Sequence, residues 1–434
     1  MKLAFSILIV LPAILSAQQP TDAGFTPIAL PDAVALAEKN SPAAVQARGA
    51  IENAQGTVST TYNQFFPTLS ASLGHSQGAG QVLDNSGKLI PRISQPQYST
   101  GLNTSYTVFD GGKRVYDLRA RKADLASAEV SEAATKFSIA LQVKQQYYAI
   151  LAARESESAA RGALDLANQQ LAASIVRVRA GAVIISDSLR SFLAVNTAQL
   201  NLLTAQNSVR NSSLALTRLV ESATPVTATA ADTSTLGIAP IDSVAVVGLA
   251  LDGPSVREAQ AALNSSNAGV KSARTSYFPT LTASLRYGGN GYDPAFGIGA
   301  GQLAYSNTLT VSANYNIWDG RNRAVALDRA QVAVEAAGAT VRDAKLFAQQ
   351  NILLQISTLR DAEERIRIQH LSVEAAQEDL RVQQQRYNMG SSTQLDVTTS
   401  QNALITAQQA LIQARLDYRT ARAQIEAIIG RDLQ

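Results

Sequence analysis

The sequence predicts an α+β membrane protein. In this prediction a trimeric 12-stranded outer-membrane β-barrel, with four strands from each chain, continues into a long periplasmic α-helical coiled-coil barrel. Three observations support it. One order of segments occurs twice, four segments alternate between apolar and polar residues, and two very long helical segments contain no proline.

The repeat is visible in blocks that match at nearly constant spacing. Three blocks recur: FPTLSASL (66–73) as FPTLTASL (278–285), YTVFDGGKR (106–114) as YNIWDGRNR (315–323), and RVRAGAVIISD (177–187) as RYNMGSSTQLD (386–396). The offset is 212 residues from Phe66 to Phe278 and 209 from Tyr106 to Tyr315. Two structural copies therefore occupy almost all of the chain.

Each copy has the same order of parts. A helical segment broken at a proline (Pro42 or Pro254) comes first, then two alternating segments around a Gly-rich loop, then a long helical hairpin. The predicted organisation is: a signal peptide (1–17); a first structural repeat (18–222) with a β-hairpin at about 65–109 and a helical hairpin at about 113–221; a linker (223–240); and a second structural repeat (241–434) with a β-hairpin at about 277–318 and a helical hairpin at about 322–430.

The first residues have the features of an export signal. Lys2 precedes an apolar run from Leu3 to Leu15, and small residues suit cleavage after Ala17. The run is shorter than the roughly 20 apolar residues of a membrane-spanning helix. Position 18 is Gln and the chain has no cysteine, so we expect an exported protein that is not lipidated and has no disulfides.

The four alternating segments predict strands. Their apolar sets are Leu69, Ala71 and Leu73; Leu102, Tyr106 and Val108; Leu281, Ala283 and Leu285; and Leu309, Val311 and Ala313. The residues between them are mostly Ser, Thr and Asn. A period of two over about 10 residues, with one apolar face, is typical of transmembrane β-strands. A half-buried strand of a soluble sheet gives the same pattern over any one segment.

The positions of the aromatic residues favour a membrane. Six lie at the helix-proximal ends of the strands and are predicted membrane-interface residues: Phe65, Phe66, Phe109, Tyr277, Phe278 and Trp318. Tyr98, Tyr287 and Tyr305 lie toward the opposite ends. Two aromatic bands that bracket apolar strands are what the two interfaces of a bilayer select.

Four strands cannot close a barrel in lipid, where an open sheet edge is not tolerated. Two chains would give eight strands and a filled interior, whereas three would give twelve and leave a pore. Because the inward face is Ser, Thr and Asn rather than a packed core, we predict a homotrimer embedded in outer-membrane lipid.

The long helical segments run from Lys113 to Ala180 and from Asn322 to Met389 without proline. At about 1.5 Å per residue, each would be on the order of 100 Å long. Returning helices are expected at about Ser186–Val220 and Gln394–Ile429. Alanine seams and Gln-rich faces suit a polar-lined tube, although an extended coiled coil without a lumen explains the helices equally well.

The repeat, with the motifs FPTLSASL, FPTLTASL, YTVFDGG, YNIWDG and RYNMG-x5-D, resembles the TolC-like outer-membrane efflux protein family. The resemblance implies a trimeric channel-tunnel that passively conducts substrate from an inner-membrane pump across the periplasm and outer membrane. It also implies a periplasmic adaptor (membrane fusion) protein docked at the helix tips. The alternative function is a non-transporting periplasmic coiled-coil spacer or adhesion protein.

The strand-to-helix turns contain Asp110-Gly111 and Asp319-Gly320. Glycine suits the positive φ of a tight turn, and aspartate suits the N-terminus of the following helix. A ligand-binding role for the two carboxylates is the alternative, and the structural role is favoured.

The helix tips contain candidate docking and gating residues. Gly181 and Gly390 fall where the long helices must reverse, and Arg177 and Arg386 precede them by one turn. The resemblance implies that these four residues also form the adaptor-docking surface.

Two carboxylates follow the tips. Asp187 and Asp396 would form a ring of six in a trimer, which would favour cations and could gate the periplasmic end by pairing with arginine. Thr393 and Asp396 also have capping-box spacing. Ser391 and Ser392 carry no charge, so any lock must use other residues.

Composition argues against catalysis and nucleic-acid binding. The net charge is +3 with scattered basic residues, which is no nucleic-acid footprint. His75 and His370 have no second His or Cys at metal-binding spacing, and no nucleophile motif occurs. We therefore expect no enzyme activity, no cofactor and no metal site.

Overall fold

The computed structural model describes residues 24–83, 85–93, 96–181, 184–229, 242–292 and 303–433. The predicted signal peptide and residues 230–240 of the predicted linker lie outside this set. The chain divides into two compact units. The first comprises Met1–Ser41, Ile139–Pro240 and Ser357–Ala423, and the second comprises Pro42–Ser138, Ile241–Ile356 and Gln424–Gln434.

The helices follow the repeat. They are α1 (Leu30–Asn40), α2 (Pro42–Asn63), α3 (Lys113–Arg179), α4 (Ile185–Val220), α5 (Ser243–Ala250), α6 (Pro254–Arg274), α7 (Asn322–Asn388) and α8 (Gln394–Ile429). Pro42 and Pro254 are the first residues of α2 and α6, where a missing N–H costs no helical hydrogen bond. Among the described residues, no helix combines the length and the hydrophobicity of a membrane span.

In the first unit, a short parallel pair packs against α3 and α4. Strand β1 (Thr26–Ile28) pairs with β6 (Val226–Ala228). Tyr147 of α3 is fully buried; its hydroxyl donates to the Ile28 carbonyl at 3.2 Å and accepts from the Thr229 N–H at 3.0 Å. Strand β6 lies within the segment 223–240, whose Thr, Ala and Pro content predicts a linker. Part of that segment is therefore buried structure.

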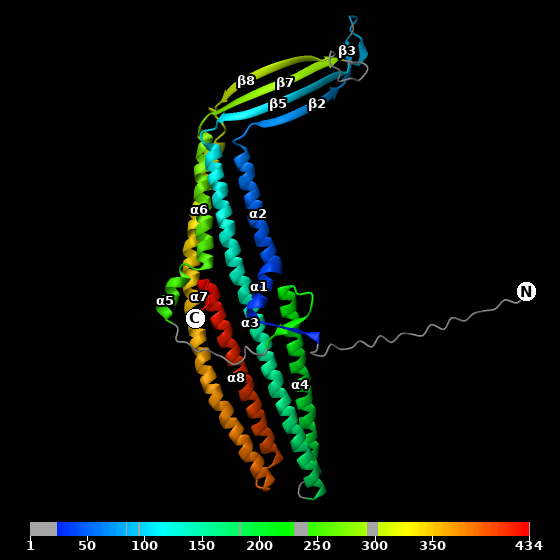
Figure 1. The fold of residues 1–434 in the computed structure, drawn as a ribbon, viewed down its shortest axis with the longest axis vertical. Helices are drawn as coiled ribbons and strands as arrows, with labels where there is room; N and C mark the ends of the chain where they lie inside the picture. The colour runs from blue at the N-terminus through cyan, green and yellow to red at the C-terminus, as the bar shows by residue number, and fades with distance from the viewer. Residues whose placement is uncertain are drawn as a thin grey trace, which may run out of the picture. The chain divides into compact units, whose positions relative to one another are not determined.

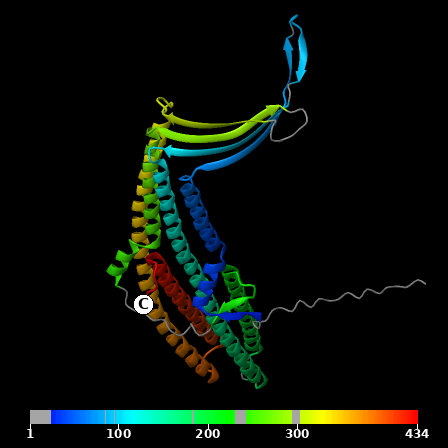
Figure 2. The same cartoon turned by 45° about the horizontal axis from the view of Figure 1, so that its top comes forward.

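In the second unit, four antiparallel strands form one sheet. They are β2 (Thr68–Ser76), β5 (Gln97–Phe109), β7 (Thr280–Tyr292) and β8 (Ala304–Asn314), in the spatial order β2-β5-β7-β8. The strands lie side by side and curve together (Figures 1 and 2). Each copy of the repeat supplies one hairpin, and the two hairpins meet where β5 pairs with β7.

The register keeps one apolar face and one polar face across the whole sheet. On one face Leu102 lies opposite Tyr287, and Leu285 opposite Leu309. On the other face, hydroxyl side chains bond within the sheet: Ser70 Oγ donates to the Asn103 carbonyl at 3.3 Å, and the Thr282 and Ser312 hydroxyls are 2.8 Å apart. The alternation read in each single segment is thus continuous over four strands.

The loop between β2 and β5 contains a hairpin that the sequence analysis missed. Strand β3 (Ala79–Leu83) pairs with β4 (Leu89–Ile93), and Gly87 between them has φ 79°. The segment was expected to be a Gly-rich loop. Its signal was the Ser-Gly pair between two short apolar runs, QVL and KLI, which is typical of a hairpin turn.

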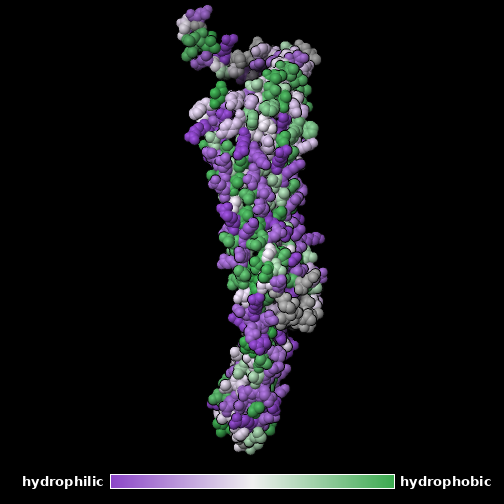
Figure 3. Space-filling view, turned by 90° about the vertical axis from the view of Figure 1, so that its left-hand side faces the viewer, coloured by the Kyte–Doolittle hydropathy of each residue, from purple (hydrophilic) through white to green (hydrophobic). Residues whose placement is uncertain are grey.

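The sheet exposes large apolar side chains. Every residue of β8 is exposed, and Leu69, Leu73, Leu309 and Val311 are among the exposed side chains. The space-filling view also shows hydrophobic residues at the surface, mixed with hydrophilic ones (Figure 3). Water alone is a poor environment for such a surface, so the apolar face and the outer strands need further partners.

Candidate functional site

The first strand-to-helix turn is organised by Asp110. This carboxylate accepts hydrogen bonds from the Gly112 N–H and the Arg114 N–H, both at 3.1 Å, at the start of α3. It also receives the Arg114 Nε at 2.9 Å, and both side chains are largely buried. Asp110 therefore supplies acceptors for unpaired N–H groups of the helix and fixes the arginine beside them.

The second turn repeats this arrangement. Asp319 Oδ2 accepts a hydrogen bond from the Arg323 N–H at 3.0 Å and forms an ion pair with the Arg323 Nε at 3.0 Å. Asp110 and Asp319 are separated by the repeat offset of 209 residues, as are Arg114 and Arg323. The two junctions are therefore structural equivalents.

Each arginine lies between two aromatic rings. Arg114 is 5.4 Å from the ring of Phe65 and 5.5 Å from that of Tyr106. Arg323 is 5.2 Å from the ring of Tyr277 and 5.8 Å from that of Tyr315. Cation–π contact and the aspartate together hold the end of each strand against the start of its helix.

Arg114 and Arg323 were missed as site residues. The motifs DGGKR and DGRNR contained the signal, because Asp and Arg four residues apart lie on one side of a helix. One aromatic partner, Tyr106 or Tyr315, lies in the same motif, whereas the other could not be read locally because Phe65 precedes its arginine by a whole hairpin.

The turn glycines differ in their surroundings. Gly111 has φ 68° and Gly320 has φ 67°, a left-handed conformation that L side chains rarely adopt. A Cβ on Gly111 would lie 2.4 Å from the Cβ of Phe278, whereas a Cβ on Gly320 would meet nothing within 4 Å among the described residues. The first turn is thus packed against the second copy, and the second turn is open.

The predicted interface aromatics lie around these junctions. Phe66, Phe109, Tyr277, Phe278 and Trp318 are exposed, and Phe65 is half-buried. Two of the six, Phe65 and Tyr277, contact the junction arginines.

At the helix tips, Arg177 links two hairpins within the first unit. Its guanidinium donates to the carbonyls of Tyr387 at 2.9 Å and Asn388 at 3.0 Å, and lies 4.7 Å from the Tyr387 ring. These are the last residues of α7, where carbonyls lack the i+4 N–H partner of a continuing helix; the Tyr387 carbonyl also accepts the Gly390 N–H at 3.1 Å. An arginine near the end of α3 thus caps the end of α7.

Gly181 and Gly390 end the long helices in a left-handed conformation. Their φ values are 70° and 77°. The Arg386 carbonyl accepts the Ser391 N–H at 2.9 Å, the pattern of a helix C-cap. Within the described part of the chain, the Arg386 side chain has no hydrogen bond such as those of Arg177.

The two tip carboxylates differ. Asp396 Oδ2 accepts from the Thr393 N–H and hydroxyl, both at 2.8 Å, and from the Ser392 hydroxyl at 2.9 Å, so the predicted capping box forms. These bonds, and the nearby positive charge of Arg386, lower the pKa of the Asp396 carboxyl. Asp187 lies in the first turn of α4, whose N-cap is Ile184 without a side-chain cap bond.

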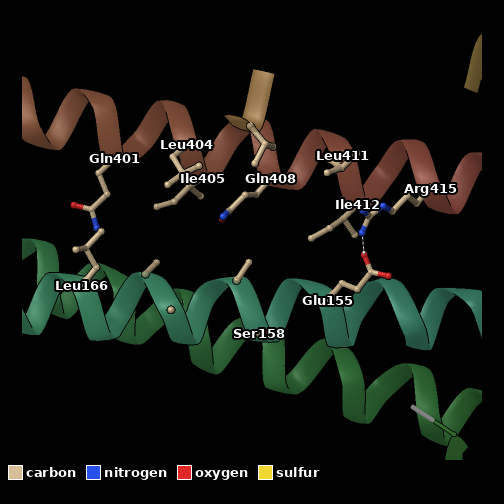
Figure 4. Close-up of a pocket in the computed structure, with 14 residues that line it drawn as sticks. Glu155, Ser158, Leu166, Gln401, Leu404, Ile405, Gln408, Leu411, Ile412 and Arg415 are labelled. Carbon is tan, nitrogen blue, oxygen red and sulfur yellow. Dashed lines mark hydrogen bonds and ion pairs between the residues drawn. The ribbon is translucent and has the colours of Figure 1, made fainter. Parts of the chain in front are cut away.

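Another feature of the first unit is a groove between α3 and α8 (Figure 4). Small residues of α3, among them Ala159 and Gly162, face leucine, isoleucine and glutamine side chains of α8. At one end Glu155 pairs with Arg415 at 3.2 Å. The groove is therefore a contact between packed helices with an ion pair at one end. The described residues contain no cluster of metal ligands.

Comparison with known proteins gives a consistent result. A family model described as outer membrane efflux protein matches residues 33–221 and 249–431. The pyoverdine export outer membrane protein OpmQ of Pseudomonas aeruginosa is 28% identical over 404 residues, which cover 88% of this chain and 79% of that protein.

Solved structures share the fold. The outer membrane channel CmeC of Campylobacter jejuni matches with a TM-score of 0.76 at 17% identity, covering 98% of this chain and 94% of that one. The MtrE outer membrane channel of Neisseria gonorrhoeae matches with a TM-score of 0.75 at 20% identity, covering 93% and 89%.

Proposed function

Because the chain belongs to the outer membrane efflux protein family, we propose that three copies of it form a passive conduit through the outer membrane. The chain is the outer-membrane component of a multipart efflux system. The observation that carries the proposal is the four-stranded sheet, with one continuous apolar face, one continuous polar face and two open edges.

A 12-stranded barrel accounts for both faces and both edges. In lipid every backbone group must be paired, so β2 and β8 need neighbours from other copies. Three sheets of four strands would close a barrel with a lumen, and the Ser, Thr and Asn face would line that lumen. The apolar face and the exposed aromatics would then contact lipid.

The conduit would use no energy of its own. The relatives named above are outer-membrane channels and export proteins, and the pump would drive transport. Substrate choice would belong to that inner-membrane pump, which is linked to the tip by a periplasmic adaptor. The spacer or adhesion alternative is not favoured, because it gives no reason for the family match or the membrane-type sheet.

We place the adaptor contact and the gate at the helix tips. Arg177, Gly181, Arg386 and Gly390 would form the docking surface, and Asp187 and Asp396 the periplasmic gate. The Arg177 link between α3 and α7 supports a closed tip held by hydrogen bonds. The protein would reside in the outer membrane, exported by its signal peptide and without a lipid anchor, and extend into the periplasm.

The test is photo-crosslinking in cells from a probe that replaces Arg386. The expected product contains an adaptor whose partner is an inner-membrane pump, and that pump would define the substrate class. A probe at Arg342, which is exposed on the same helix α7, is the matched control and should not capture the adaptor. Capture of only further copies of this chain from Arg386 would contradict docking at the tip.

A further inference from the structure

The repeat gives the register of a contact that the single chain cannot make. We infer that β8 of one subunit pairs antiparallel with β2 of the partner subunit, in the register in which β5 pairs with β7 within one chain. In this arrangement Phe66 of the partner subunit packs on Gly320. The inference rests on the proposed trimer and adds the residues that meet between copies.

The two hairpins show that the repeat offsets hold in space. Thr68 pairs with Ser105 in the first copy. The offsets of 212 and 209 residues convert this pair to Thr280 and Asn314, which are partners in the second copy. The register of one strand pair therefore predicts, through these offsets, the register of the equivalent strand pair.

The same conversion applies to the contact between the copies. Ser105 pairs with Ser284 and Tyr106 with Ala283. The equivalent pairs are Asn314 with Ser72 of the partner subunit and Tyr315 with Ala71 of the partner subunit. Both keep the faces matched, because Asn314 and Ser72 lie on the polar side and the other two residues on the apolar side.

The early end of β8 indicates that a strand from another subunit is needed beside it. Strand β5 continues to Phe109, and its last residues pair with β7. The equivalent of Phe109 is Trp318, yet β8 stops at Asn314. Their equivalents in β5 pair with β7 except at Val108, where the register shifts, so Tyr315, Asn316 and Trp318 are the residues that the partner's β2 would pair.

The exposure of this stretch agrees. Ile317 and Trp318 are 85% and 80% exposed, whereas their equivalents Val108 and Phe109 are 48% and 46% exposed. Residues 315–318 continue the alternating pattern of a strand but are unpaired within one chain. This indicates a sheet edge that a second subunit completes.

The turns give an independent indication. Gly111 is held against Phe278, and the equivalent pair is Gly320 with Phe66. Within one chain the space at Gly320 is open among the described residues, and Phe66 is exposed. The partner's Phe66 has the chemistry to fill that space, because it repeats a contact already made once in each chain.

Disulfide crosslinking tests the register, since the native chain has no cysteine. The variant carries Ser72→Cys and Asn314→Cys, on the polar face where an oxidant can reach them. Directly opposite residues have Cβ atoms close enough for a disulfide, whereas residues shifted by two do not. The expected product is a covalent ladder of dimer and trimer that collapses on reduction.

Two matched variants serve as controls. Ser70→Cys with Asn314→Cys keeps the same face and shifts the pair by two residues, so it should crosslink several-fold less. Ser105→Cys with Ser284→Cys joins strands within one chain and should stay monomeric on a denaturing gel.

The outcomes separate the register from the trimer. Strong crosslinking of the shifted pair, with trimers that form under reducing conditions, would overturn the register and leave the trimer intact. If neither the native chain nor any reduced variant forms trimers in membranes, the proposed assembly and this inference are both wrong.

Discussion

At the residue scale, the structure assigns a shared task to two Asp–Arg pairs. Each aspartate caps the first turn of a long helix and also binds the arginine one turn later. The arginine in turn contacts two aromatic rings near the strand ends. The largely buried Asp–Arg pair and the aromatic contacts together fix the direction in which each helix leaves its strand.

Replacing Arg114 by lysine should loosen this junction. Lysine keeps the charge but loses the planar fork that binds Asp110 and stacks on the rings, so we expect a loss of about 1–2 kcal/mol in unfolding free energy. Urea unfolding of the detergent-extracted protein measures it. Arg119→Lys is the control, because Arg119 is exposed and contacts the ring of Tyr116 on the same helix. An equal effect of both variants would sink the assignment.

The Asp396 cap should depend on acidity. Because its pKa is lowered in the folded protein, the cap contributes stability above the ordinary value of 3.8, and that stability is lost as the pH falls through the lower, folded value. The protection factor for hydrogen exchange at the start of α8, which is corrected for the intrinsic rate at each pH, should therefore fall at acidic pH. The start of α4, where Asp187 makes no such cap, serves as the internal control. A protection factor at the start of α8 that does not change with pH would contradict the prediction.

At the element scale, local patterns predicted the elements and long-range pairing decided the rest. Alternation predicted β2, β5, β7 and β8, and the prolines predicted the starts of α2 and α6. Strands β1 and β6 have three residues each and pair across 200 positions, so no local period could reveal them. The tip link was equally hidden, because Arg177 and Tyr387 meet only after both hairpins have formed.

Replacing Tyr147 by phenylalanine should weaken the attachment of β1 and β6. The Ile28 carbonyl and the Thr229 N–H would each lose one partner but keep their bond to each other at 3.2 Å, so the loss should be about 0.5–1.5 kcal/mol, the net value of a hydrogen bond. Thermal unfolding followed by circular dichroism measures this loss. No change in the unfolding midpoint would show that water replaces the hydroxyl at no cost.

Replacing Arg177 by lysine should loosen the tip. A lysine cannot reach both α7 carbonyls with a planar fork, so the channel should conduct more at rest and cells should take up large antibiotics more readily. Arg179→Lys, an exposed neighbour on the same helix, is the control. Unchanged resting conductance in the Arg177 variant would remove this residue from the gate.

At the scale of the whole molecule, a chain with a twofold repeat would provide one third of the proposed closed barrel. Half a chain supplies two strands and one long helical hairpin, and the contact between halves anticipates the proposed contact between chains. The family and the fold could be inferred from the sequence, because the repeat blocks are long and ordered. The Phe65 and Tyr277 contacts of the junction arginines and the tip link could not, because they join residues far apart in the chain.

We expect three copies of this protein to form a conducting pore in a bilayer, with a gate at the helix tips that restricts conductance at rest. The most direct measurement is single-channel recording after the purified protein is added to a planar lipid bilayer. We predict discrete steps of uniform conductance from trimeric protein, and larger resting steps from the Arg177→Lys variant. A trimeric preparation that inserts into the bilayer and gives no conductance, in the native form and in the variant, would contradict the claim.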